Sequence, residues 1–148
     1  MLQQHDQQER LTAFLESLPN RVDVPDQWER RLAKRGVTDP VYDDRRKFAR
    51  FLLGGADCRA GLEYRQTLPS LPRERGWHGI YVLDFSRNGL RLLHDQLLFP
   101  RERFRVLMPN GTLARIEVVR GIRVQAQCYE IGVRFVAEPQ QIDALESV

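Results

Sequence analysis

The sequence predicts a mainly β domain, a small antiparallel barrel or sandwich, preceded by a helical extension. From about residue 57 to residue 135, short alternations of apolar and polar residues recur five or six times, separated by turn residues. This pattern is typical of half-buried strands. No segment suited to a long helix lies between the strands, so a parallel sheet of βαβ units is not expected. Before residue 40, the apolar residues recur at helical spacing instead.

Two helices are expected in the N-terminal extension. Residues 6–18 carry apolar side chains at helical spacing, namely Leu11, Phe14, Leu15 and Leu18. Residues 25–35 are the second candidate, with Pro25 in the first turn, acidic residues early, basic residues late and Gly36 after the last turn. Residues 38–50 are polar and are expected to form a linker or an ordered loop.

The strands and their connections follow from the period-two pattern. The predicted strands are residues 57–64, 79–83, 90–93, 103–108, 113–124 and 129–135. Pro109-Asn110-Gly111-Thr112 is a hairpin turn signal, and Gly121 is a candidate bulge. We therefore expect a helical extension over residues 1–40, the β domain over 41–138, and a short C-terminal helix or tail over 139–148.

Composition and motifs exclude several classes of protein. The 148 residues, 42% of them apolar, suit one domain with a real core. No apolar run approaches the ~18 residues that span a bilayer, and the N-terminus lacks a secretory signal, so a cytoplasmic protein without membrane insertion is expected. The two cysteines and three histidines lack the spacing of a metal site. Because no nucleophile elbow, Walker loop or metalloprotease motif occurs, a non-enzymatic role without cofactor or metal is expected.

Arginine dominates the positive charge of the chain. Only Lys34 and Lys47 are lysines among 23 cationic residues, which leaves 21 arginines. Guanidinium groups bind phosphate and the guanine edge in a forked geometry, but a G+C-rich genome would raise arginine content equally. The Arg46/Arg50 spacing is weak evidence alone, because about three such pairs are expected by chance and four occur.

A scarcer pattern lies between two predicted strands. Asp84-x-Ser86-x-x-Gly89 follows the alternation of Ile80 and Val82, where the strand is expected to break into a tight turn. About 0.02 occurrences of this pattern are expected by chance in this composition. Asp84 and Ser86 offer oxygen atoms, and Gly89 is expected to take a positive φ. The turn is therefore a candidate site for an anion or a base edge.

Three motifs, in order, resemble the PilZ domain family. They are Arg45-Arg46-Lys47-Phe48-Ala49-Arg50, Asp84-x-Ser86-x-x-Gly89, and Tyr129-Glu130-Ile131-Gly132-Val133-Arg134-Phe135. The resemblance covers about residues 43–138 and implies a six-stranded antiparallel barrel that binds the bacterial second messenger cyclic di-GMP. It also implies a receptor that regulates a protein partner in motility, exopolysaccharide production or secretion, as in biofilm formation.

The resemblance implies a role for each candidate residue. Arg46 and Arg50 would clamp phosphate and the guanine O6/N7 edge, and Arg45 would stack on a guanine face. Asp84 would accept from the guanine N1–H and N2 amino group, Ser86 would hydrogen-bond nearby, and Gly89 would keep the turn open. Many members carry an aromatic residue before the final hairpin. Here the sequence is Ile116-Glu117-Val118-Val119-Arg120, and Arg120 is a candidate to replace that platform in part.

Other interpretations stay open from the sequence alone. Asp84 and Ser86 could cap their own turn, and Asp43 and Asp44 could pair with the neighbouring arginines. The chain could be a PilZ-like interaction module without ligand, or a small barrel that binds nucleic acid. We rank the last possibility lowest and expect no nucleic acid partner, because the aromatic residues mostly alternate inward rather than toward bases.

Overall fold

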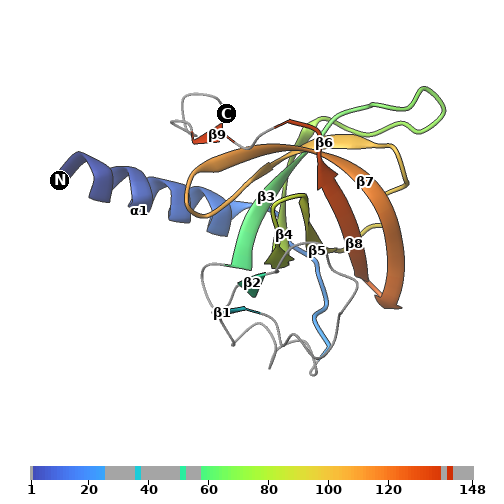
Figure 1. The fold of residues 1–148 in the computed structure, drawn as a ribbon, viewed down its shortest axis with the longest axis horizontal. Helices are drawn as coiled ribbons and strands as arrows, with labels where there is room; N and C mark the ends of the chain where they lie inside the picture. The colour runs from blue at the N-terminus through green and yellow to red at the C-terminus, as the bar shows by residue number, and fades with distance from the viewer. Residues whose placement is uncertain (1, 26–35, 38–50, 53–57, 138–139, 142–148) are drawn as a thin grey trace.

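The chain folds into a closed antiparallel β-barrel with one N-terminal helix (Figure 1). The computed structural model describes residues 2–25, 36–37, 51–52, 58–137 and 140–141. Its elements are α1 (Leu2–Ser17), β1 (Gly36–Val37), β2 (Phe51–Leu52), β3 (Arg59–Tyr64), β4 (Gly76–Phe85), β5 (Gly89–His94), β6 (Arg103–Leu107), β7 (Thr112–Gln125), β8 (Cys128–Phe135) and β9 (Gln140–Gln141). The predicted second helix, over residues 25–35, lies almost entirely outside the described residues.

Six strands close the barrel in the order β4-β3-β6-β7-β8-β5, with β5 paired back to β4. Every pairing is antiparallel, which confirms the six-stranded antiparallel barrel. The short strands β1 and β2 continue the sheet beyond β4, and β9 pairs with β7. A closed barrel leaves few free strand edges, which otherwise promote aggregation.

The barrel interior is filled by the apolar positions of the alternating strands. Leu62, Ile80, Leu92, Val106 and Ile131 have no exposed surface and belong to one cluster. Residues i and i+2 of a strand point to the same face, so one inward set from each strand is enough to build the core. This packing explains why period-two alternation located all six barrel strands.

The N-terminal helix packs on the outside of the barrel. Leu11 and Leu15 are buried against Leu107, and the Phe14 ring meets Trp77 edge to face at a centroid distance of 6.1 Å. The C-terminal half of α1 packs its apolar side chains on the barrel, and Gln8 Nε2 in the other half donates to the Pro109 carbonyl at 2.9 Å. In Figure 1 the helix extends sideways from the barrel. The helix begins at Leu2, four residues earlier than predicted.

The segment after α1 continues along the barrel wall. The Gly79 amide donates to the Pro19 carbonyl at 2.8 Å, and the Asp23 amide donates to the Gln127 carbonyl at 3.0 Å. Val22 and Val24 pack against a second cluster of buried residues on the barrel exterior, Leu83, Leu93 and Cys128. The described part of the extension is therefore attached to the barrel.

Two predictions about the later strands are wrong. Gln140 and Gln141 form strand β9 opposite Leu113 and Thr112, so these two residues are not helical; the rest of the expected C-terminal helix or tail lies outside the described residues. The bulge in β7 does not lie at Gly121 but falls between Val118 and Arg120, with a second irregularity between Arg123 and Gln125. Gly121 has a packing role instead, because a Cβ atom there would lie 2.8 Å from Leu97 Cδ1.

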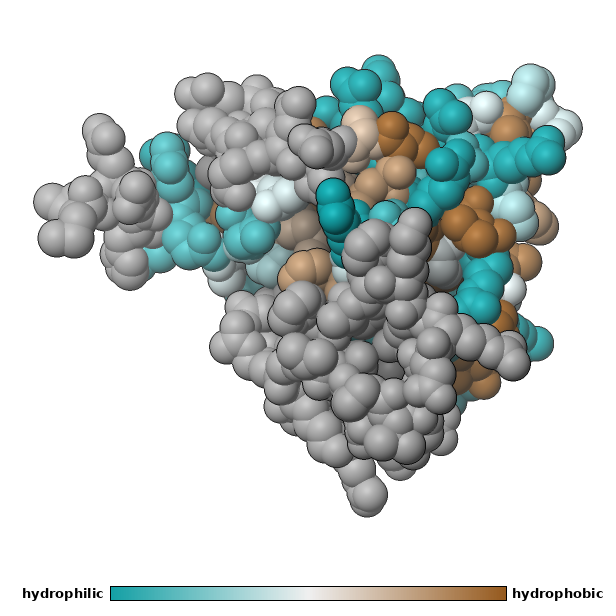
Figure 2. Space-filling view, viewed as in Figure 1, coloured by the Kyte–Doolittle hydropathy of each residue, from teal (hydrophilic) through white to brown (hydrophobic). Residues whose placement is uncertain are grey.

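The coloured part of the surface in Figure 2, which belongs to the described residues, carries apolar residues in small patches beside hydrophilic ones. Among the described residues the exposed large apolar side chains are Phe99, Val119 and Ile122, and no helix in the described ranges has the length and apolar character needed to cross a bilayer.

Candidate functional site

The turn between β4 and β5 is shorter than the sequence predicted. Strand β4 does not break at Asp84 but continues to Phe85, because Asp84 and Phe85 pair with both β5 and β2. The Ser86 amide donates to the Gly89 carbonyl, and the Phe135 amide donates to the Asn88 carbonyl, each at 2.8 Å. The turn is thus held at one end of the barrel against the last residues of β8.

Gly89 is required for a different reason from the one predicted. Among the described glycines, positive φ values occur at Gly76 and Gly111, so the expectation of a positive φ at Gly89 is wrong. A Cβ atom at Gly89 would instead lie 2.0 Å from the Val133 carbonyl oxygen and 2.9 Å from Arg134 Cα. The absence of a side chain lets β5 approach β8 closely at the site.

A bulge in β4 directs Asp84 toward an arginine of β5. Val82 pairs with Leu92 and Asp84 with Arg91, which leaves Leu83 without a paired residue on β5. The Asp84 side chain is fully buried, and its two carboxylate oxygens accept from Arg91 Nε at 3.1 and 2.9 Å. A further hydrogen bond joins Arg91 Nη2 to the same carboxylate.

Arg91 is held by carboxylates from two strands. Its Nη1 donates to Glu130 Oε1 on β8 at 2.8 Å, while Asp84 binds the other edge of the guanidinium group. Burial lowers the pKa of Arg91, but the hydrogen bonds and charges of Asp84 and Glu130 outweigh this effect and raise it above its ordinary value. Arg91 is therefore a fixed, permanently charged donor group.

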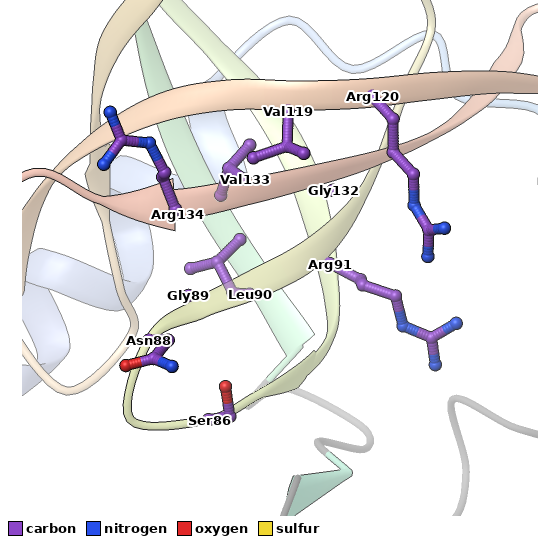
Figure 3. Close-up of a pocket in the computed structure, with 10 residues that line it drawn as sticks. All are labelled: Ser86, Asn88, Gly89, Leu90, Arg91, Val119, Arg120, Gly132, Val133 and Arg134. Carbon is purple, nitrogen blue, oxygen red and sulfur yellow. The ribbon is translucent and has the colours of Figure 1, made fainter. Parts of the chain in front are cut away.

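A cavity of about 360 Å³ opens above the turn. Its lining residues come from the β4–β5 turn and from β5, β7 and β8: Ser86, Asn88, Gly89, Leu90, Arg91, Val119, Arg120, Gly132, Val133 and Arg134. In Figure 3 the side chains of Arg91 and Arg120 extend to the same side, whereas Arg134 points the other way. The volume lies near the lower end of the range for small-molecule sites.

Arg120 extends over the cavity because of its neighbours on β7 and β8. The β7 bulge leaves Val119 and Arg120 both exposed, although adjacent strand residues normally face opposite sides. Arg120 of β7 pairs with Gly132 of β8. A Cβ atom on residue 132 would lie 3.3 Å from Arg120 Cγ, so the glycine leaves room for the Arg120 side chain. Within the described part of the chain, the Arg120 guanidinium makes no hydrogen bond or ion pair.

Comparison with known proteins identifies the family. A family model of the PilZ domain matches residues 44–147. The chain belongs to the PilZ domain family. PilZ domains are binding modules for cyclic di-GMP. The match includes the Arg45–Arg50 run and all six barrel strands, whereas α1 lies before it. No curated protein matched the chain.

The structure describes four of the seven residues predicted to bind cyclic di-GMP. Ser86, Gly89 and Arg120 line one cavity, and Asp84 lies behind it against Arg91. Arg45, Arg46 and Arg50 lie outside the described residues. Phe51, the next residue in the chain, pairs with Phe85 directly before the turn. The arginine run therefore ends one residue from a strand that borders the site.

Three polar or glycine positions of the cavity were given no ligand role from the sequence: Arg91, Gly132 and Arg134. Arg91 lies two positions after Gly89, which places both on the same face of β5. From this spacing, Arg91 could have been predicted to lie at the site. The approach of Arg120 to Gly132 depends on the β7–β8 register and the bulge, which the sequence pattern does not specify.

Proposed function

We propose that this PilZ domain is a cyclic di-GMP receptor that acts on a protein partner. The observation that carries the proposal is the meeting of Ser86, Gly89 and Arg120 at one cavity. Arg120 lies 31 residues after Gly89 in the sequence, and the resemblance to the PilZ family implies a ligand role for all three residues. The arginine run that ends at Arg50 precedes strand β2, which pairs beside the same turn.

The chemistry of the cavity suits a ligand with two phosphates and two guanines. Arg91 and Arg120 extend to one side, and each guanidinium can donate two parallel hydrogen bonds to a phosphate or to the guanine O6/N7 edge. Ser86 supplies a hydroxyl group beside the turn, and Gly89 contributes only backbone atoms to the lining of the cavity. The site thus offers cations, forked donors and close backbone approach.

The two cavity arginines differ in their ion pairs, and we therefore expect different contributions to ligand binding. The Asp84 and Glu130 carboxylates already neutralise Arg91, whereas Arg120 has no counter-ion among the described residues. We expect Arg120 to contribute most of the new attraction to a phosphate and Arg91 to contribute a fixed geometry. Asp84 would hold Arg91 in place, in addition to its predicted role as an acceptor for guanine.

We expect cyclic di-GMP binding to act on the protein partner through a conformational change of the N-terminal extension. Contacts from Arg46 and Arg50 to the ligand would change the conformation of the Asp43–Arg50 segment, which precedes a strand of the barrel sheet. The partner would belong to a motility, exopolysaccharide or secretion system in the cytoplasm. In this proposal the protein binds and signals and does not catalyse a reaction.

The site assignment is tested by calorimetric titration of variants with cyclic di-GMP. Replacement of Arg46 and Arg50 together by alanine should weaken binding at least about a hundredfold, and Arg120→Ala about tenfold to a hundredfold, through the loss of charged hydrogen bonds. Arg123→Ala is the matched control, because Arg123 is exposed on the same strand outside the cavity. Equal affinity of wild type, R120A and the double variant would refute the assignment.

A further inference from the structure

A second, larger groove lies on the outer face of the barrel. It has a volume of about 600 Å³ and crosses strands β6, β7 and β8 beside the end of β3. Five arginines line it: Arg65, Arg103, Arg105, Arg115 and Arg134. Apart from Arg134, none of these residues lines the cavity at the β4–β5 turn. The groove is therefore a separate feature that the proposed ligand site does not use.

Two carboxylates pair with four of the arginines that line the groove. Glu63 accepts from Arg105 Nε at 3.0 Å and from Arg65 Nη2 at 2.8 Å. Glu117 accepts from Arg103 Nε at 3.0 Å and from Arg134 Nη2 at 2.8 Å. Five guanidinium groups against two carboxylates leave three positive charges, which equals the formal net charge of the whole chain.

The excess positive charge is concentrated around Arg115. Arg115 stands directly opposite Arg105 in the β6–β7 pairing, and such like-charged cross-strand pairs are destabilising. Within the described residues Arg115 has no ion pair or hydrogen bond. Arg65 Nε is buried and has no acceptor there either. An anion bound between these groups would relieve the repulsion and supply the missing acceptor.

We propose that this groove binds an acidic segment of a protein, through carboxylates that pair with Arg115 and its neighbours. Arg103 and Arg105 are two residues apart on β6, and alternate residues of an extended peptide have the same spacing, roughly 6.6 Å. Forked arginine donors suit carboxylates. The peptide can place neutral residues beside the Glu117 carboxylate.

A nucleic acid fits the groove less well than an acidic peptide. Its backbone carries a phosphate at every nucleotide, so a phosphate that reached Arg103 or Arg134 would also approach the Glu117 carboxylate that pairs with both. Single strands also bind through bases stacked on exposed aromatic rings. Phe104 in the groove is buried and Phe135 half-buried, so neither ring is freely presented.

This proposal rests on the proposed function, because it identifies the protein partner as one with an acidic segment and the groove as the surface that binds it. The two proposals can nevertheless fail separately. Arg115 does not line the ligand cavity, so its substitution should not alter cyclic di-GMP binding.

The test measures fluorescence anisotropy of a short labelled peptide that alternates glutamate and serine. The full-length chain should bind it, and the same peptide with glutamine in place of glutamate should not bind. Arg115→Glu should weaken binding about tenfold or more, since it removes an attraction and adds a repulsion, and Arg115→Gln should weaken it less. Arg123→Glu, the same change at an exposed position of the same strand, should change affinity less than about twofold.

The variants are expected to fold. Arg115→Glu would place a carboxylate opposite Arg105 and so remove a like-charge pair. Thermal melting should show no loss of stability, and cyclic di-GMP titration should match wild type. Equal peptide affinity in wild type, R115E and R115Q would overturn the proposal. Binding of an oligonucleotide or polyphosphate that depends on Arg115, without binding of the acidic peptide, would overturn it as well.

Discussion

Replacement of Gly89 by alanine tests whether close approach of β5 and β8 shapes the site. The new Cβ atom would lie 2.0 Å from the Val133 carbonyl oxygen, whereas ordinary carbon–oxygen contacts are about 3.3–3.6 Å. The two strands would have to separate by more than ~1 Å here. The hydrogen bond from the Phe135 amide of β8 to the Asn88 carbonyl, 2.8 Å long, would then exceed hydrogen-bonding distance.

The expected loss of stability follows from these changes. One hydrogen bond contributes about 1 kcal/mol, and overpacking costs about 1–3 kcal/mol, so we expect Gly89→Ala to lower the free energy of unfolding by about 3 kcal/mol. For a chain of 148 residues this corresponds to a melting temperature lower by roughly 6–12 °C. Cyclic di-GMP affinity should fall as well, because Gly89 lines the cavity.

Gly132→Ala is the matched control for this substitution. Gly132 lines the same cavity, but its new Cβ atom would meet only the flexible Arg120 side chain, at 3.3 Å. An alanine also reduces the entropy of the unfolded chain, so the stability of G132A should stay within about 0.5 kcal/mol of wild type or rise slightly. Urea denaturation of both variants measures the difference. Equal stability of G89A and G132A would refute the argument.

Two further predictions concern stability away from the site. Burial lowers the pKa of His94 to about 3, so below pH 6.5 the unfolded chain binds a proton that the native protein does not. The free energy of unfolding should therefore fall as the pH falls, by about 2 kcal/mol between pH 7.5 and 5, and urea titrations of His94→Gln should show a smaller pH dependence. An unchanged slope in that variant would contradict the assignment. Leu15→Ala should cost about 2–4 kcal/mol in urea unfolding because Leu15 is buried against the barrel, whereas Glu16→Ala at the next, exposed position should cost little. Equal effects of L15A and E16A would mean that α1 adds nothing to the stability of the fold.

The barrel could be predicted from the sequence because each strand buries one face. Leu90 and Leu92, and likewise Ile131 and Val133, alternate with polar residues and lie in the core as expected. The start of β4 was placed three residues too late. Gly76 to His78 show no alternation, and their pairing with β3 makes them part of the strand. Strand ends depend on the partner strand as much as on the local pattern.

The site could be predicted only as a set of residue types. Asp84, Ser86 and Gly89 stood out by their spacing, but the ion pair of Asp84 with Arg91 depends on a bulge that the spacing does not reveal. The requirement for glycine at position 89 was recognised, yet its cause lies in β8, more than forty residues away. Such contacts follow from the register of the closed barrel rather than from neighbours in the sequence.

The most direct test of the central claim is calorimetric titration of the full chain with cyclic di-GMP, with GTP and a short oligonucleotide as controls. The proposed receptor should bind cyclic di-GMP with a dissociation constant on the order of 1 μM or tighter and give much less heat with either control. The fitted stoichiometry would distinguish one bound molecule from a stacked pair. No measurable heat with cyclic di-GMP would contradict the receptor function and leave a PilZ barrel that acts through protein contacts alone.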